Sequence, residues 1–287
     1  CSSTSATNNV PLAITSRVTL RKGARAVEIE TSFENTATHH RLRAMFPTAR
    51  DGSRCFVESA FDVVERETKF SPSSPWWGWH GVTFPQQRFV DVSDHIAGLA
   101  IINDGLREYE VTQDEDRVIA LTLIRAFAVA LCPVSKCWEE LPEMALAQAP
   151  GAHTFRYLIY PHTDDYLEGG VLEQAERFVV PLEVAQAGRH AGDLPPRHTF
   201  FELQPDTLLL SALKPAENGD GYIVRVYNPT LVTQEGELTF AFPLRHAERV
   251  TLEETAGEAL AFEENTLTFD APPKKIVTLR VQLHQES

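Results

Sequence analysis

The chain has 287 residues and carries 26 Lys and Arg against 40 Asp and Glu, which gives a formal net charge of −14 at pH 7. A field of this sign repels phosphate backbones and anionic lipid headgroups, so nucleic-acid and membrane partners are not expected. No stretch approaches the roughly 18 consecutive apolar residues of a membrane-spanning helix, and we expect a soluble protein.

The start of the chain and its cysteines bear on processing and compartment. Residues 1–9 have neither a basic start nor an apolar run, so they are not a signal peptide, and we expect the chain to be cut from a longer protein. The four cysteines, Cys1, Cys55, Cys132 and Cys137, are too few for a secreted disulfide framework. Cys132 and Cys137 form either half of a structural zinc site or, as we favour, a pair of reduced thiols. The protein is therefore expected in the cytoplasm.

The predicted elements are mostly strands, because apolar residues recur with period two. Residues 27–33 alternate between apolar and polar side chains, which indicates a strand with one wet face, and residues 277–283 do the same near the end of the chain. By contrast, residues 99–102 and 118–124 are apolar at successive positions, as strands covered on both faces are. This mixture predicts a thick β-sandwich with interior strands.

Turns and short helices punctuate the strands. Residues 217–221, Glu-Asn-Gly-Asp-Gly, predict a tight hairpin between strands 207–213 and 222–227. Two short helices are expected, at residues 142–149 and 170–178. The Pro-rich segment 188–196 predicts a subdomain boundary.

Several catalytic motifs are missing from the sequence. It has no Gly-x-Ser-x-Gly elbow, no Walker phosphate loop and no His-Glu-x-x-His zinc helix, and Gly219-Asp220-Gly221 lacks the context of a dinucleotide site. His162-Thr163-Asp164 has the spacing of two metal ligands, but we favour a polar strand end there.

Six segments, taken in order, resemble the carboxyl-terminal β region of bacterial α-mannosidases of glycoside hydrolase family 38. The longest runs from Phe84 to Val111 and contains Asn103-Asp104-Gly105. The others are residues 34–48 around His40-Arg41-Leu42-Arg43, 59–66, 121–125, 153–162 and 210–229. The resemblance implies an all-β fold: a large galactose-mutarotase-like β-supersandwich over residues 1–190, a smaller terminal β-sandwich over residues 191–287, and few short helices. The family's catalytic barrel is expected before these residues and is absent from them.

The same resemblance implies a function. The full-length protein would be a zinc-dependent retaining α-mannosidase, with the zinc bound by the missing barrel and no cofactor in this chain. This chain would be its non-catalytic part, inactive alone, which supports and completes the active-site cleft. Its expected partners are its own N-terminal barrel, an α-mannoside and other copies in a homo-oligomer. Two alternatives stay open: a free-standing carbohydrate-binding module and an aldose mutarotase-like protein.

No residue of this chain is expected to be catalytic, but several are candidates for the substrate side. Trp76, Trp77, Trp79 and His80 offer flat apolar faces for a sugar or the barrel, although a loop packed on its own sandwich is favoured. Arg125 is the best single candidate, because the family has an arginine that approaches the substrate after the equivalent strand. Its alternative is a buried ion pair with Asp104 or Glu108.

The remaining candidates are weaker. Asn103, Asp104 and Tyr109 lie in the most family-like segment, yet Asn-Asp-Gly is also ordinary turn sequence, so a structural role is favoured. His39, His40 and His95 are interpreted as satisfied polar groups without a functional role.

Overall fold

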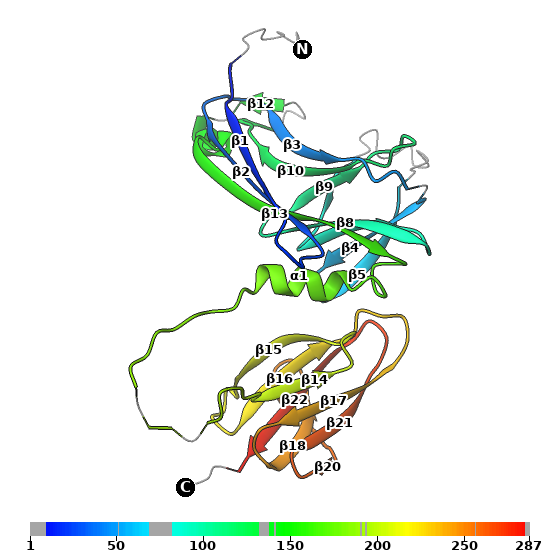
Figure 1. Ribbon diagram of the computed structural model, residues 1–287, viewed down its shortest axis with the longest axis vertical. Helices are drawn as coiled ribbons and strands as arrows, with labels where there is room; N and C mark the ends of the chain where they lie inside the picture. The colour runs from blue at the N-terminus through cyan, green and yellow to red at the C-terminus, as the bar shows by residue number, and fades with distance from the viewer. Residues whose placement is uncertain are drawn as a thin grey trace. The chain divides into compact units, whose positions relative to one another are not determined.

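The computed structural model describes residues 10–50, 52–68, 82–131, 138–140, 142–189, 191–192, 194–255 and 257–284. Its contacts divide the chain into two compact units, one made of residues 1–57 and 65–180 and the other of residues 58–64 and 181–287. The Pro-rich segment 188–196 therefore lies within the second unit. Both units are β structures, as predicted (Figure 1).

The described part of the first unit is built on two antiparallel sheets (Figure 1). The larger sheet has seven strands in the order β1 (Ile14–Thr19), β2 (Val27–Asn35), β13 (Gly151–Thr163), β8 (Ala97–Asn103), β7 (Phe89–Ser93), β4 (Arg54–Ser59) and β5 (Asp62–Glu67), of which residues 58, 59 and 62–64 are counted with the second unit. The smaller sheet has four strands in the order β3 (Arg41–Phe46), β10 (Ile119–Arg125), β9 (Glu108–Val111) and β6 (Phe84–Pro85). A separate two-stranded ribbon joins β11 (Val129–Leu131) to β12 (Trp138–Glu140).

The core of the first unit lies between its two sheets. Ile29 and Ile101 of the larger sheet pack in one cluster with Tyr109, Ile119 and Leu121 of the smaller one. The alternation predicted for residues 27–33 is confirmed in β2, where every second residue from Ile29 onward is buried. Burying such side chains stabilises the unit by about 1.5–3 kcal/mol each before the loss of chain entropy.

The two strands predicted to be covered on both faces, β8 and β10, are indeed buried on both. Helix α1 (Val171–Val179) explains this for β8, because it packs on the outer face of the larger sheet with Val171, Leu172 and Ala175 buried (Figure 1). The outer face of β10 is covered differently, by charged side chains of its neighbours that are described below.

The second unit is a smaller sandwich of two antiparallel sheets (Figure 1). One sheet has the order β14 (Phe201–Gln204), β17 (Gln234–Phe240), β21 (Thr266–Ala271) and β20 (Phe262–Glu263). The other has the order β15 (Leu209–Pro215), β16 (Tyr222–Tyr227), β22 (Ile276–Leu283), β18 (Leu244–Val250) and β19 (Glu258–Ala259). Val224 and Leu279 pack against Leu238 and Leu267 across the sandwich.

The predicted turn and helices are confirmed. β15 and β16 pair as an antiparallel hairpin, and Gly219 and Gly221 take positive φ angles of 77° and 86° in its turn. The helix expected over residues 170–178 is α1, and that expected over residues 142–149 is the 3₁₀ helix η1 (Pro142–Gln148). Among the described residues, no helix has the length and apolar character needed to cross a membrane.

Candidate functional site

The predicted site residue Arg125 lies in a group of charged side chains on the outer face of the smaller sheet. Three arginines and two glutamates meet there, and we call them the arginine–glutamate cluster: Arg41 and Arg43 of β3, Glu108 and Glu110 of β9, and Arg125 of β10. Alternation explains the pairs on β3 and β9, since residues two apart on one strand point the same way, and a register shift between Thr122 and Ile124 pairs Arg125 with Arg41. The cluster has one positive charge in excess although the chain as a whole is acidic.

Ion pairs of this cluster span the central strand of the sheet. β10 lies between β3 and β9, and the Arg43 guanidinium reaches across it to Glu110 with an Nη1–Oε2 distance of 2.5 Å. Ala120 and Thr122 are small enough to lie beneath these long side chains, and both are buried. The charged pairs thus cover β10 and keep it out of solvent.

Arg125 is held by two contacts but stays accessible. Its Nη1 donates to Glu108 Oε2 at 3.2 Å, and its guanidinium lies over the Phe127 ring, 4.9 Å from the centroid. Its side chain is still 52% exposed. Glu108, one of the two partners weighed from the sequence, also accepts a 2.9 Å hydrogen bond from Thr122 Oγ1 and lies 3.7 Å from Arg41 Nε. Among the described residues, no hydrogen bond uses its Nε or Nη2, so these donors can serve hydroxyl or carboxylate groups of a ligand.

Asn103 is fully buried and organises a turn. Its Nδ2 donates to Gln86 Oε1 at 3.0 Å and to the Arg88 carbonyl at 3.1 Å, while its Oδ1 accepts from the Leu106 backbone N–H at 2.7 Å. These bonds use both ends of the amide to fix the β8–β9 connection. In this unit, Asn103 has a structural role and no surface open to a ligand.

Tyr109 is also buried, in the core between the sheets. Its hydroxyl lies 3.9 Å from Cys55 Sγ, and its ring is 6.1 Å from that of Phe84. Burial raises the pKa of the Tyr109 hydroxyl and raises the pKa of the Cys55 thiol to about 11, so both groups stay protonated at neutral pH. Asp104, next to the turn, is exposed.

Several other predicted positions lie outside the described residues. These are Trp76, Trp77, Trp79 and His80 of the aromatic segment, and Cys132 and Cys137 of the weighed zinc pair. Their roles remain predictions.

His162 and Asp164 of the motif His162-Thr163-Asp164 lie in different surroundings, the first buried and the second near the surface. The His162 ring turns inward, where its Nε2 lies 2.8 Å from Asp91 Oδ1, and neither side chain is exposed. Asp91 Oδ2 also accepts a 2.5 Å hydrogen bond from Ser93 Oγ. Burial alone lowers the pKa of His162, but the hydrogen bond and charge of Asp91 outweigh it, and the pKa is raised. Both ring nitrogens have partners, since Nδ1 faces the Thr163 carbonyl at 3.2 Å, so His162 is not placed to bind a metal.

Asp164 belongs to a second group near the surface. Possible ligand atoms of Asp164, Asp165 and His95 lie within 4.8 Å of one another. The sequence analysis did not bring these residues together, because the contact depends on the pairing of β8 with β13, which places the β7–β8 turn beside the end of β13. Asp165 Oδ1 already accepts from the backbone N–H groups of Leu167 and Glu168. The group is an arrangement of polar loop ends, and we assign it no ion.

The other two histidines differ from each other. His39 approaches Gln148, with 3.1 Å between the two Nε2 atoms, which agrees with a satisfied polar group. His40 does not fit that interpretation, because both its ring nitrogens are buried without a hydrogen-bond partner in the described parts of the chain.

Arg41, Arg43 and Glu110 are the cluster members that the sequence analysis did not single out. A signal was available, since Arg41 and Arg43 alternate with Leu42 in the family-like segment and must share one face of a strand. Their partners could not be inferred, because they come from β9, more than 60 residues later.

Comparison with known families finds two matches in the order expected. Residues 3–130 match the model described as "Glycosyl hydrolases family 38 C-terminal domain", and residues 207–279 match "Glycosyl hydrolases family 38 C-terminal beta sandwich domain". All five residues of the arginine–glutamate cluster and the Asn103 turn fall in the first match, and most of the terminal sandwich falls in the second.

Individual proteins give the same result. The chain is 30% identical over 280 residues, 94% of its length, to a Halalkalibacterium halodurans protein whose name proposes mannosylglycerate hydrolysis. It is 24% identical over 276 residues, also 94% of its length, to human alpha-mannosidase 2C1. It covers 29% and 24% of the lengths of these two relatives.

A solved structure extends the comparison to the fold. The crystal structure of an alpha-mannosidase from Enterococcus faecalis V583 matches 96% of this chain with a TM-score of 0.80 and 29% identity, and the match covers 29% of that chain. On the two family matches, their order and this fold, the chain belongs to the carboxyl-terminal region of glycosyl hydrolase family 38.

Proposed function

We propose that the chain is the non-catalytic C-terminal β region of a zinc-dependent retaining α-mannosidase, in which it supports and completes the active-site cleft of a catalytic barrel outside these residues. The observation that carries the proposal is the pair of ordered family matches over residues 3–130 and 207–279. The chain spans less than a third of the relatives it matches, which leaves ample length for such a barrel. The zinc and the two reacting carboxylates are proposed to belong to that barrel.

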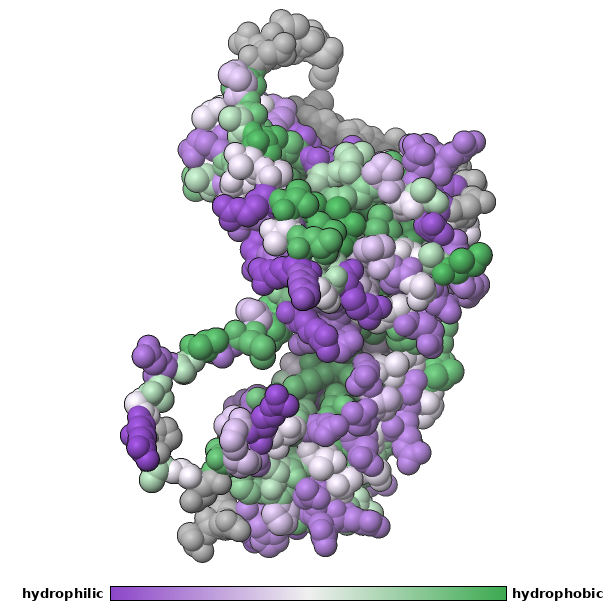
Figure 2. Space-filling model, in the orientation of Figure 1, coloured by the Kyte–Doolittle hydropathy of each residue, from purple (hydrophilic) through white to green (hydrophobic). Residues whose placement is uncertain are grey.

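Exposed apolar side chains favour contact with another part of a larger protein. Residues 181–187 follow α1 as extended chain, and Leu182 and Val184 in this segment are 97% and 95% exposed. Figure 2 shows hydrophobic side chains along the first part of this segment. Contacts with the rest of the enzyme would remove them from water.

The arginine–glutamate cluster is the proposed substrate-facing element of this region. Arg125 is half exposed, is held in place by Glu108 and Phe127, and keeps free guanidinium donors. It would bind a sugar hydroxyl of a neutral α-mannoside or the carboxylate of mannosylglycerate. The cluster's excess positive charge suits the second type of substrate.

Compartment and assembly are further parts of the proposal. The buried free thiol of Cys55 is compatible with the reducing cytoplasm that the cysteine content favours. A homo-oligomer of the full-length enzyme remains a prediction, to be checked by the mass of the purified protein in solution.

The test is an assay of the full-length enzyme with zinc on an aryl α-mannoside and on mannosylglycerate. Arg125→Ala is expected to lower kcat/KM about 10- to 100-fold, because the variant loses a hydrogen bond from a charged group to the substrate. Arg125→Lys should restore part of the loss. The matched control is Arg54→Ala, because Arg54 is a similarly exposed arginine paired with Glu65 outside the cluster.

The outcomes separate the two parts of the proposal. Hydrolysis of neither substrate by the zinc-loaded full-length enzyme would overturn the α-mannosidase assignment. Hydrolysis with an Arg125→Ala loss no larger than that of Arg54→Ala would leave the assignment standing and remove Arg125 from the substrate side. A larger loss on mannosylglycerate than on the aryl mannoside would place the carboxylate at Arg125.

A further inference from the structure

A pocket opens at one end of the terminal sandwich, entirely within the second unit. It has a volume of about 830 Å³ and lies between the β15–β16 turn, the loop before β18 and the end of β22. A smaller hollow of about 310 Å³ continues from it and shares Pro215, Tyr222, Phe242 and Leu283. Together they form one open site with an apolar part and a polar part.

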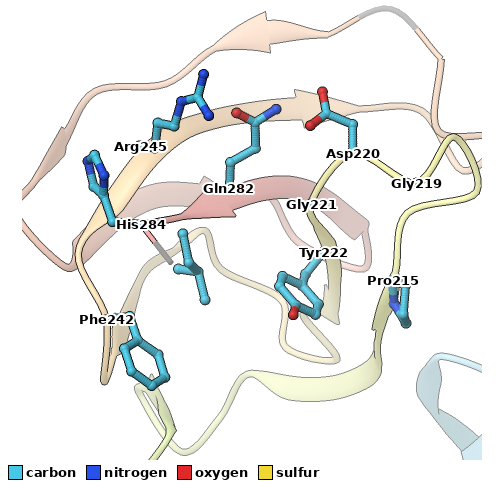
Figure 3. A pocket seen from close by; sticks show the side chains of 10 residues that line it. Pro215, Gly219, Asp220, Gly221, Tyr222, Phe242, Arg245, Gln282 and His284 are labelled. Carbon is cyan, nitrogen blue, oxygen red and sulfur yellow. The ribbon is translucent and has the colours of Figure 1, made fainter. Parts of the chain in front are cut away.

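The apolar part presents two aromatic rings to solvent. Tyr222 is 42% exposed and Phe242 is 40% exposed. Figure 3 shows both rings on one side of the pocket, with Arg245, Gln282 and Asp220 on the other. Exposed aromatic rings that line the same pocket are typical of a binding surface.

The polar part offers hydrogen-bonding groups that the protein itself does not use. The side chains of Arg245, Gln282 and Asp220 have no hydrogen-bond or ion-pair partner among residues 10–284 as far as the structure describes them. They supply guanidinium donors, an amide with both a donor and an acceptor, and carboxylate acceptors. The charges of Arg245 and Asp220 offset each other, which favours a neutral ligand.

The turn that carries Asp220 is held close to the end of β22. Gly221 has a φ of 86°, and a Cβ there would lie 2.3 Å from the Val281 carbonyl oxygen. This close approach brings Asp220 and Tyr222 to the same pocket as Gln282. The wall is therefore fixed by backbone packing rather than by a free loop.

We propose that this pocket binds a neutral oligosaccharide by stacking a pyranose ring on Tyr222, with Phe242 as a second aromatic surface of the same pocket. A pyranose presents an apolar C–H face and an edge of hydroxyl groups, and the pocket offers an aromatic side and a side of unused donors and acceptors in the same arrangement. The proposal goes beyond the function proposed above, because it requires binding and no hydrolysis. The terminal sandwich would thus bind a glycan at a site that takes no part in hydrolysis.

The experiment titrates the whole 287-residue chain with α-mannotriose and, separately, with maltotriose. Calorimetry and NMR measure the binding of each sugar. One stacked ring and a few hydrogen bonds predict a Kd on the order of 1 mM. Tyr222→Ala is expected to weaken binding about five- to tenfold, and Gln282→Ala several-fold. The control variant is Leu231→Ala, which removes a 79% exposed side chain of the same unit away from the pocket and should leave the Kd unchanged. Circular dichroism melting shows whether each variant is folded.

The results decide the proposal in either direction. Binding of either sugar that is weakened in folded Tyr222→Ala and Gln282→Ala supports it, and a preference for α-mannotriose ties the site to α-mannosides. No binding up to about ten times the expected Kd, or binding that both pocket variants leave unchanged, overturns it. Self-association that Tyr222→Ala abolishes, without sugar binding, also overturns it and identifies a second copy as the occupant. Because the chain is tested without a catalytic portion, these outcomes are independent of the α-mannosidase assignment.

Discussion

The buried pair of His162 and Asp91 is predicted to contribute strongly to the stability of the first unit, and Asp91→Asn tests it. The substitution keeps the shape of the side chain and removes its charge. In the wild type, His162 Nε2 lies 2.8 Å from Asp91 Oδ1, and neither side chain is exposed. Removing one partner of a buried charged pair typically costs about 3–5 kcal/mol, because the other group is left without compensation. We expect Asp91→Asn to lower the free energy of unfolding of the first unit by about 3 kcal/mol at pH 6.

The effect has a defined pH dependence. The pKa of His162 is raised above its ordinary value of 6.5 in the folded state, so folding favours the protonated ring. The resulting stabilisation is fully present below pH 6.5 and is lost as the pH rises through the folded-state pKa, at about 1.4 kcal/mol for each unit of the shift. The difference in unfolding free energy between wild type and Asp91→Asn should therefore be largest near pH 6 and smaller at pH 9.

The measurement can be confined to the first unit. All four tryptophans, Trp76, Trp77, Trp79 and Trp138, lie in its part of the chain, so urea unfolding followed by tryptophan fluorescence reports that unit. Asp91→Asn, His162→Gln and the double variant form a cycle that isolates the coupling between the two side chains.

A control and a refutation complete the design. His246→Gln changes a partly exposed histidine of the second unit and should shift the free energy of unfolding measured by fluorescence by less than about 0.5 kcal/mol. A coupling energy near zero at pH 6, or a loss in Asp91→Asn that grows between pH 6 and pH 9, would refute the reasoning.

Three further predictions concern the first unit. Gly98→Ala should lower the unit's free energy of unfolding by about 1–3 kcal/mol, since a Cβ there would lie 2.4 Å from the ring of buried His162. Gly188→Ala is the control, because a Cβ at that position would have no atom within 4 Å. Equal urea unfolding midpoints for the two variants would contradict the prediction. Asn103→Ala should cost about 2–4 kcal/mol in urea unfolding, because it leaves buried turn groups without partners, while exposed Asp104→Ala should be nearly neutral. Cys55, with a pKa of about 11, is roughly 0.1% thiolate at pH 8, so peptide mapping should find it unlabelled by iodoacetamide until urea unfolds the unit; fast labelling of folded protein would show that the thiol is not buried.

Much of the secondary structure could be predicted from local sequence patterns. The alternation in β2, the double burial of β8 and β10, the β15–β16 hairpin and helix α1 all follow from residue spacing and turn chemistry. These features depend on neighbours in the chain, which the sequence displays directly. The family resemblance extended this reading to the fold class and to the glycosyl hydrolase family, and both are confirmed.

The candidate site could be read only in part. Arg125 was identified at the end of its strand, but its choice of Glu108 over Asp104 depends on β9 pairing with β10. Asn103 and Tyr109 lie in a family-like segment for which the sequence favoured a structural role, and only the packed structure shows that both side chains are enclosed.

The sequence by itself determined the β architecture and the turn positions, because strand periodicity and turn residues act over a few neighbouring positions, and its resemblance to family 38 segments indicated the family. The tertiary structure decided which charges meet. The order β3-β10-β9 brings Arg43 to Glu110 over Ala120, and the order β13-β8-β7 turns His162 toward Asp91 rather than toward a metal with Asp164. Contacts of this kind join residues about 70 positions apart, and they follow from long-range strand pairing that no local pattern encodes.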